Sequence, residues 1–93
     1  MSKSKSKQFR IGEYAIGGII EARVTKEEPE YELVEVKALD WNDPETVVMS
    51  DWAETDSPVW KQGISDTLHE MTTSYYADKV MAWINSQISK VKK

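Results

Sequence analysis

The spacing of hydrophobic residues changes once along this chain, near Ser57, and that change limits the folds open to it. Before this point, apolar and polar residues alternate, as they do along a strand with one buried face. After it, apolar residues recur every three or four positions, as on an amphipathic helix. Strands first and helices last predict an α+β fold, with the helices packed on an antiparallel sheet.

The clearest alternation lies in residues 14–25 and 31–39. We predict that these stretches form an antiparallel hairpin, because the polar connector 26–30 has the length of a hairpin loop. On the solvent side of this hairpin, charged residues are expected to face one another across the strands. These residues are Glu21, Arg23, Glu35 and Lys37.

Further strands are predicted around this hairpin. Residues 46–50 have the composition of a short third strand, and residues 9–11 allow a fourth, so the sheet is expected to have three or four strands. Gly17 and Gly18, inside the first long strand, indicate a bulge, a bend or the close approach of another backbone.

The helical part of the chain has a predicted start at Ser57 and Pro58, a serine cap followed by a proline in the first turn. Two offset apolar stripes follow. The β-branched and polar segment 72–74 separates them, so residues 58–90 form either two helices or one broken helix. The stripes are Trp60, Ile64, Leu68, Met71 and Tyr75, and then Tyr76, Val80, Trp83 or Ile84, Ile88 and Val91.

Charge is distributed as unevenly as hydrophobicity. Residues 1–10 carry four basic residues and no acidic one, whereas residues 21–56 carry twelve carboxylates against three basic residues. The alternating serines and lysines of residues 1–8 cannot bury apolar surface, so we expect a disordered basic tail there. Residues 9–93 are then expected to form a single small domain.

Composition also indicates a compartment. The chain has no cysteine, so it forms no disulfide and no thiolate zinc site. No apolar run approaches the ~20 residues that span a bilayer, and the N-terminus lacks the apolar stretch of a signal peptide. We therefore expect a cytoplasmic protein with no membrane partner.

Few residues offer catalytic or metal-binding chemistry. His69 is the only histidine, and Ser65 lies one helical turn before it, but the polar neighbours of His69 favour an exposed position. The oxygen-rich segment 40–45 lacks the spacing of an EF-hand and is explained by turn residues. We expect no enzymatic activity, no cofactor and no metal.

Residues 38–60 contain six carboxylates, no basic residue and three of the four tryptophans. Trp60 belongs to the first helical stripe and is expected in the core. Trp41 and Trp52 are flanked by aspartates, and they are either contact residues of a binding surface or rings that close the end of the sheet. The first interpretation gives a predicted partner-binding set: Asp40, Trp41, Asp43, Glu45, Asp51, Trp52 and Glu54.

These features predict a small acidic protein-binding module, an inhibitor or an adaptor, that engages a basic surface of a larger partner. The alternative is a nucleic-acid-binding domain that uses the basic N-terminal tail and the C-terminal helix. Nucleic acid is ranked as an unlikely partner, because the acidic body repels it and no aromatic residue is interleaved with the tail lysines.

A homodimer and a monomer are equally open from the sequence, since the apolar stripes of the helices could exceed what the sheet covers. The general character is similar to that of small proteins from phages and mobile elements. No motif in the chain names a family.

Overall fold

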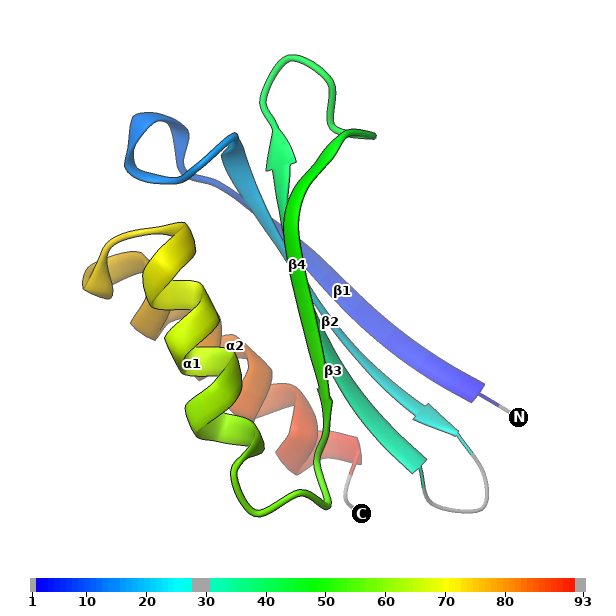
Figure 1. Cartoon of the computed structure of the whole chain (residues 1–93). Coiled ribbons are helices and arrows are strands. Elements are labelled where there is room, and N and C mark those ends of the chain that lie inside the picture. The colour runs from blue at the N-terminus through cyan, green and yellow to red at the C-terminus, as the bar shows by residue number, and fades with distance from the viewer. Residues whose placement is uncertain (1, 28–30, 92–93) are drawn as a thin grey trace.

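A computed structural model describes residues 2–27 and 31–91 (Figure 1). It contains a four-stranded antiparallel sheet followed by two helices, which confirms the predicted α+β class. The elements are β1 (Ser2–Arg10), the 3-10 turn η1 (Gly12–Tyr14), β2 (Gly18–Glu27), β3 (Tyr31–Asp40), β4 (Val47–Glu54), α1 (Trp60–Met71) and α2 (Ser74–Val91).

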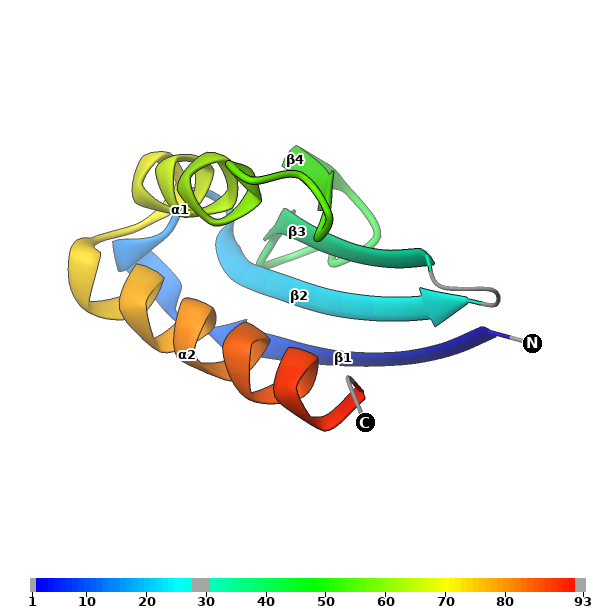
Figure 2. The same ribbon diagram turned by 90° about the horizontal axis from the view of Figure 1, so that it is seen from below.

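The strands follow one another across the sheet in the order β1-β2-β3-β4, each antiparallel to its neighbour. Both helices lie on the same face of this sheet, as Figure 2 shows. α1 packs against β3 and β4, and α2 packs against β2. The sheet therefore has a covered face and an open face, and β1 and β4 are its two edges.

The core lies between the covered face and the helices. Every second residue of β2 and β3 points into it, which explains the alternation in the sequence. The register places Glu21 opposite Lys37 and Arg23 opposite Glu35 on the open face, as the hairpin pattern predicts. The buried core residues are Ile20, Ala22, Val24, Val34, Val36, Ala38, Trp60, Ile64, Leu68, Met71, Ala77, Val80 and Ile84.

The prediction of a disordered tail over residues 1–8 is wrong for the described part of that segment. Residues Ser2–Arg10 form β1, which pairs with β2 from Ser2 opposite Glu27 to Arg10 opposite Ile19. The pairing uses backbone groups, so it does not need apolar side chains, and Phe9 packs against the core at the end of the strand. Lysines on an edge strand also oppose unwanted pairing with other chains.

The first long strand begins later than the alternation predicts. β2 begins at Gly18, because residues 12–14 form η1 and both Gly17 and Gly18 have positive φ, at 73° and 106°. A Cβ on Gly17 would lie 2.5 Å from the carbonyl oxygen of Leu39. The two glycines therefore mark a bend with close backbone approach, two of the options that the sequence left open.

The last strand is longer than predicted. β4 runs to Glu54 rather than ending at residue 50, and its pairing with β3 shifts so that Leu39 faces Val47 while Ala38 faces Met49. Val48 is the residue that the shifted register skips. The extension places Asp51, Trp52 and Glu54 on a strand, where neighbouring side chains point to opposite faces.

The helical segment forms two helices, one of the two options open from the sequence. The predicted start at Ser57 and Pro58 is wrong: α1 begins at Trp60, and its N-cap residue, Val59, gives no side-chain cap. Ser57 instead forms a turn, in which its carbonyl accepts the N–H of Trp60. The first stripe ends with α1 at Met71, and Tyr75 lies in α2 with its side chain exposed.

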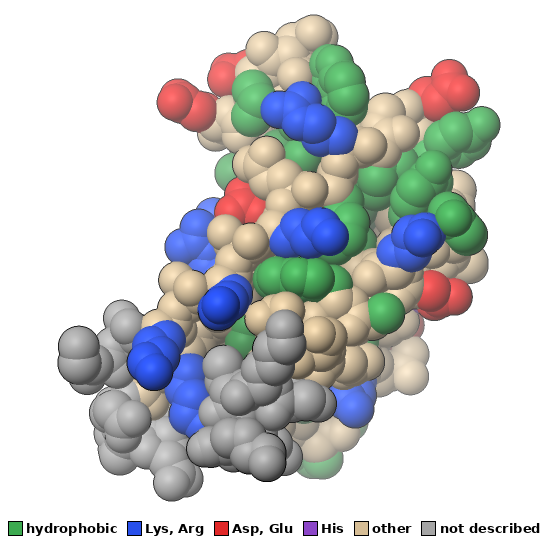
Figure 3. Space-filling model, turned by 180° about the vertical axis from the view of Figure 1, so that it is seen from behind, with side chains coloured by type: hydrophobic (Ala, Val, Ile, Leu, Met, Phe, Trp, Pro, Cys, Tyr) green, Lys and Arg blue, Asp and Glu red, His purple; other side chains and the backbone are tan. Residues whose placement is uncertain are grey.

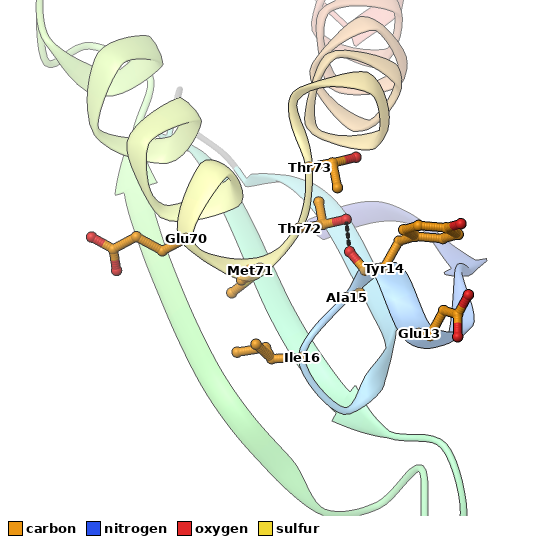
Figure 4. A pocket seen from close by; sticks show the side chains of 8 residues that line it. All are labelled: Glu13, Tyr14, Ala15, Ile16, Glu70, Met71, Thr72 and Thr73. Atoms are coloured by element: carbon orange, nitrogen blue, oxygen red, sulfur yellow. Dashed lines mark hydrogen bonds between the residues drawn. The ribbon is translucent and has the colours of Figure 1, made fainter.

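The break between the helices is fixed to the loop before β2. Thr72 is extended and forms a bridge with Ala15, and its hydroxyl donates a hydrogen bond to the carbonyl of Tyr14 (Figure 4). The N–H of Ile16 donates to the carbonyl of Met71 at 2.8 Å. An extended residue with strand-like pairing cannot continue a helix, so the β-branched segment ends α1.

Candidate functional site

The formal charge of the strands changes from positive to negative across the sheet. β1 carries four basic residues and no acidic one, β2 carries two of each, β3 carries three acidic residues and one basic residue, and β4 carries two acidic residues and no basic one. The 41–46 loop before β4 adds Asp43 and Glu45. We call β1 the basic edge, and β4 with the 41–46 loop the acidic edge. The charge asymmetry of the sequence thus becomes an asymmetry between two opposite edges.

The open face itself is close to electrically neutral. The register places four acidic and three basic residues on it, and Arg23 pairs with Glu21 at 3.4 Å. Three large apolar side chains on β4 and just after β3 are also about half exposed or more, and the register separates Trp52 from the other two by four or more residue positions along the strands. We call these three the tryptophan patch: Trp41, Val47 and Trp52.

Trp52 is the most exposed member of the tryptophan patch, with 60 % of its surface accessible. It lies on β4 directly opposite Glu35 of β3, and Glu54 follows two residues later on the same face. Residues paired in this way have Cβ atoms about 5 Å apart, and residues two apart on a strand lie about 7 Å apart. Trp52 therefore has a carboxylate on two sides.

Trp41 has a partly structural role. Its backbone N–H donates to the carbonyl of Gly17 at 2.6 Å, and a Cβ added to Gly18 would lie 3.0 Å from the Trp41 Cβ. The Arg10 guanidinium lies 5.4 Å from the centre of the Trp41 ring. The ring is nevertheless 46 % exposed, so both predicted roles of Trp41, closing the sheet and offering contact area, are compatible with its position.

The acidic residues of the 41–46 loop hold its turn together. Asp43 accepts hydrogen bonds from the Thr46 hydroxyl at 2.7 Å and from the Glu45 backbone N–H at 3.3 Å. The carbonyl of Asp40 accepts the N–H of Asp43. Glu45 and Asp43 are exposed, and Asp40 is half-buried at the end of β3. Within residues 2–27 and 31–91, no group of three or more acidic or histidine side chains is placed to hold a metal ion.

Asp51 is separated from the other predicted contact residues. It lies opposite Val36 on the covered face, and its carboxylate accepts the Thr67 hydroxyl of α1 at 2.6 Å and the Trp52 backbone N–H at 2.8 Å. The carboxylate therefore ties α1 to the acidic edge. The structure brings Trp41, Trp52 and Glu54 to the open face, and it places Asp51 behind them.

The Asp51–Thr67 hydrogen bond gives a stability prediction. Thr67→Val removes the donor and leaves a half-buried carboxylate with one partner fewer, so we expect a loss of about 1–3 kcal/mol in the free energy of unfolding. Thermal and urea unfolding measure this loss. Ser65→Ala on the same helix is the control, with an expected change within about 0.5 kcal/mol. An equal effect of the two substitutions would contradict the assignment.

The Ser65–His69 pair is not arranged for nucleophilic activation. The His69 Nδ1 lies 2.8 Å from the Ser65 backbone carbonyl, which can only accept a hydrogen bond, so this nitrogen is the donor. The Ser65 hydroxyl lies 3.4 Å from the same nitrogen. A protonated Nδ1 cannot accept the hydroxyl proton, and the contact is therefore a local helix interaction.

A shallow hollow lies where the helix break meets η1, and Figure 4 shows its lining. The carboxylates of Glu13 and Glu70 point away from each other there, and the hydroxyl of Thr72 is used by the Tyr14 carbonyl. The polar groups do not converge on a common point. The contacts around this hollow join the helix break to the loop before β2, and its polar groups do not form a set that could bind a ligand.

Sequence reasoning missed two parts of the surface. The sequence predicts only a charge pair for Glu35, which also lies opposite Trp52. The composition of β1 predicts a tail, although the period of two in its lysines is a strand signal. The fold also brings residues of distant segments to the basic edge, such as Trp83 of α2, which contacts Phe9.

Among the described residues, no helix is long and apolar enough to cross a membrane. No protein-family model, no curated protein and no solved structure matches the chain.

Proposed function

We propose that this chain is a protein-binding module that uses the open face of its sheet at the acidic edge. The observation that supports this most is the exposure of Trp52, which is 60 % accessible. Large exposed aromatic side chains on a rigid strand supply contact area at a low cost in conformational entropy.

The chemistry around Trp52 favours a basic partner. A partner arginine can stack on the indole while its N–H groups donate to the carboxylates of Glu35 and Glu54. Arginine fits this arrangement better than lysine, because its planar guanidinium stacks and donates in a fork. Trp41 and Val47 offer separate apolar area toward the other end of β3, and the exposed Asp43 and Glu45 add a field that attracts a positive surface.

Within this proposal, the predicted contact set is revised. Trp41, Trp52 and Glu54 form the contact surface together with Glu35 and Val47, whereas Asp43 and Glu45 act at long range from the loop. Asp40 lies at the margin, and Asp51 supports β4 from the covered face. Inhibitor and adaptor remain the two versions of this function, and they differ only in what the partner does.

The proposal is tested by affinity capture with three baits: the wild-type chain, Trp52→Ala and Tyr75→Ala. Tyr75 is the matched control, because it is an aromatic residue of nearly equal exposure, 63 %, and lies on α2. Support is one protein that wild type and Tyr75→Ala retain after nuclease treatment, that Trp52→Ala loses, and that salt weakens. Equal capture by all three baits would refute the assignment of this surface.

A further inference from the structure

The basic edge carries a line of lysines on one face of the sheet. Lys3, Lys5 and Lys7 lie opposite Lys26, Val24 and Ala22 of β2, and all three are exposed. Alternate residues of a strand repeat about every 7 Å, so the three ammonium groups form a regular row. Within the described part of the chain, none of these three lysines forms an ion pair with a carboxylate.

Aromatic side chains continue this row. Phe9 follows Lys7 on the same face, the Lys7 Nζ lies 5.2 Å from its ring centre, and Trp83 of α2 meets Phe9 edge to face at 6.4 Å. Farther along α2, toward its N-terminal end, Tyr76 stacks on Tyr14 of η1 at 6.2 Å.

The tyrosines at that end are the more exposed aromatic side chains, since Phe9 and Trp83 are half-buried. Tyr14 is 54 % exposed and Tyr75 is 63 % exposed, and the Lys79 Nζ lies 5.0 Å from the Tyr75 ring centre. Tyr76 and Trp83 are seven residues apart, two turns, so they share one side of α2. Positive charge and aromatic area therefore run along β1 and the flank of α2 beside it.

Figure 3 views the molecule with β1 and α2 toward the reader. Lys and Arg side chains gather along this face, and hydrophobic side chains lie between them. We infer that this surface, which we call the lysine–aromatic strip, binds single-stranded nucleic acid. Its members are Lys3, Lys5, Lys7, Phe9, Tyr14, Tyr75, Lys79 and Trp83.

The combination favours a single strand over other anionic partners. A row of cations follows a phosphate backbone, and exposed rings stack on bases, which a single strand presents and a duplex keeps stacked inside. An anionic membrane or an acidic protein would use the lysines but would have no bases to stack on the tyrosines. The aromatic residues therefore decide between these partners.

The fold changes both sequence arguments against nucleic acid. Seven of the acidic residues that oppose it lie on β3, β4 and the 41–46 loop, away from β1, whereas Glu13 of η1 and Asp78 of α2 lie on the same elements as the strip. The missing aromatic residues are supplied by η1 and α2 rather than by the segment that carries the lysines. This surface is separate from the tryptophan patch, so the two proposals can fail independently.

The test is fluorescence anisotropy with a labelled single-stranded oligothymidylate, titrated with the full chain at several salt concentrations. Neutralising three or four phosphates predicts a slope of log affinity against log salt of roughly −2 to −3. The variant K3Q/K5Q/K7Q should reduce the magnitude of that slope by about 2. Tyr75→Ala should weaken binding about five- to 150-fold, the loss of one stacked base.

Two controls are built into the chain. Lys61→Gln on α1 removes one positive charge outside the strip, and Trp52→Ala removes an aromatic residue from the other surface; both should bind the oligonucleotide as wild type does. Circular dichroism checks that every variant is folded.

Three results would overturn the inference. The first is a K3Q/K5Q/K7Q variant that binds as tightly as wild type. The second is equal affinity for a duplex of the same length. The third is binding to vesicles of anionic lipid as tight as binding to the oligonucleotide, with no effect of Tyr75→Ala on either, which would indicate a surface that only recognises negative charge.

Discussion

Replacing Gly17 with alanine is expected to lower the free energy of unfolding by roughly 2–4 kcal/mol. Gly17 has a φ of +73°, which an alanine adopts only at a cost, and the new Cβ would lie 2.5 Å from the Leu39 carbonyl oxygen. That oxygen belongs to the backbone of β3, so it cannot move aside as a flexible side chain would. The melting temperature should fall by roughly 10–25 °C.

Two other glycines separate the causes of that loss. Gly12 also has a positive φ, at 81°, but no atom lies within 4 Å of its added Cβ, so Gly12→Ala should show the backbone strain alone, about 1 kcal/mol. Gly63 lies in α1 with open space around it, and Gly63→Ala should stabilise the protein by up to about 1 kcal/mol. Thermal unfolding of the three variants measures the series. A Gly17→Ala variant as stable as wild type would contradict the close approach of Gly17 to the backbone of β3.

Replacing Trp52 with alanine is expected to weaken the affinity for the captured partner by about 30-fold or more, the loss typical of a central aromatic contact. The ring is exposed in the free protein, so the same substitution should change the free energy of unfolding by no more than about 0.5 kcal/mol. Isothermal titration with the purified partner gives the affinity, and urea unfolding gives the stability.

The neighbouring carboxylates refine this prediction. Glu35→Gln and Glu54→Gln should each weaken binding less than Trp52→Ala does, and both should make binding less sensitive to salt, because they remove charge and keep shape. Tyr75→Ala should leave the partner affinity unchanged. Suppose that Trp52→Ala binds the partner as wild type does and the carboxylate variants do not. Binding would then depend on charge alone, and the role given to the indole would be wrong.

The central hairpin could be predicted because two independent patterns agree on it. Alternation indicates which residues of β2 and β3 face the helices, although Ile19 and Leu39 are buried on the other face. The charges of Glu21, Arg23, Glu35 and Lys37 fit the same register. A one-residue shift would have reversed every side chain, so the buried face determines the pairing. The change from one apolar stripe to another near Thr72 indicated either two helices or one broken helix, and the structure has two.

β1 could not be predicted from its composition. A rule based on apolar content assigns alternating serine and lysine to disorder, whereas the strand is held by backbone pairing with β2 and by Phe9 at its end. The helix start was missed because Ser57 supports a turn before α1 rather than a cap. The deciding contacts of β1 are made with a neighbouring segment, and those before α1 are made within a local turn.

The candidate site was predictable in part. The cluster of acids and tryptophans in residues 38–60 indicated a surface, and the division of its members between two faces follows once β4 is known to reach Glu54. Asp51 and Trp52 are adjacent on a strand and therefore point to opposite faces. The lysine–aromatic strip combines residues of β1, η1 and α2. These segments are distant in the sequence, and no local sequence pattern predicts that they lie side by side.

The measurement that tests the account most directly is amide hydrogen exchange of β1 by nuclear magnetic resonance. The opposition of a basic edge and an acidic edge depends on the pairing of Lys5 with Val24 and Lys7 with Ala22, which places the lysines in one row. We expect every second amide between Lys3 and Phe9 to exchange slowly, protected by hydrogen bonds to β2. Exchange of all these amides at the rate of an unstructured chain would contradict the account, because a free tail has no edge and no common face.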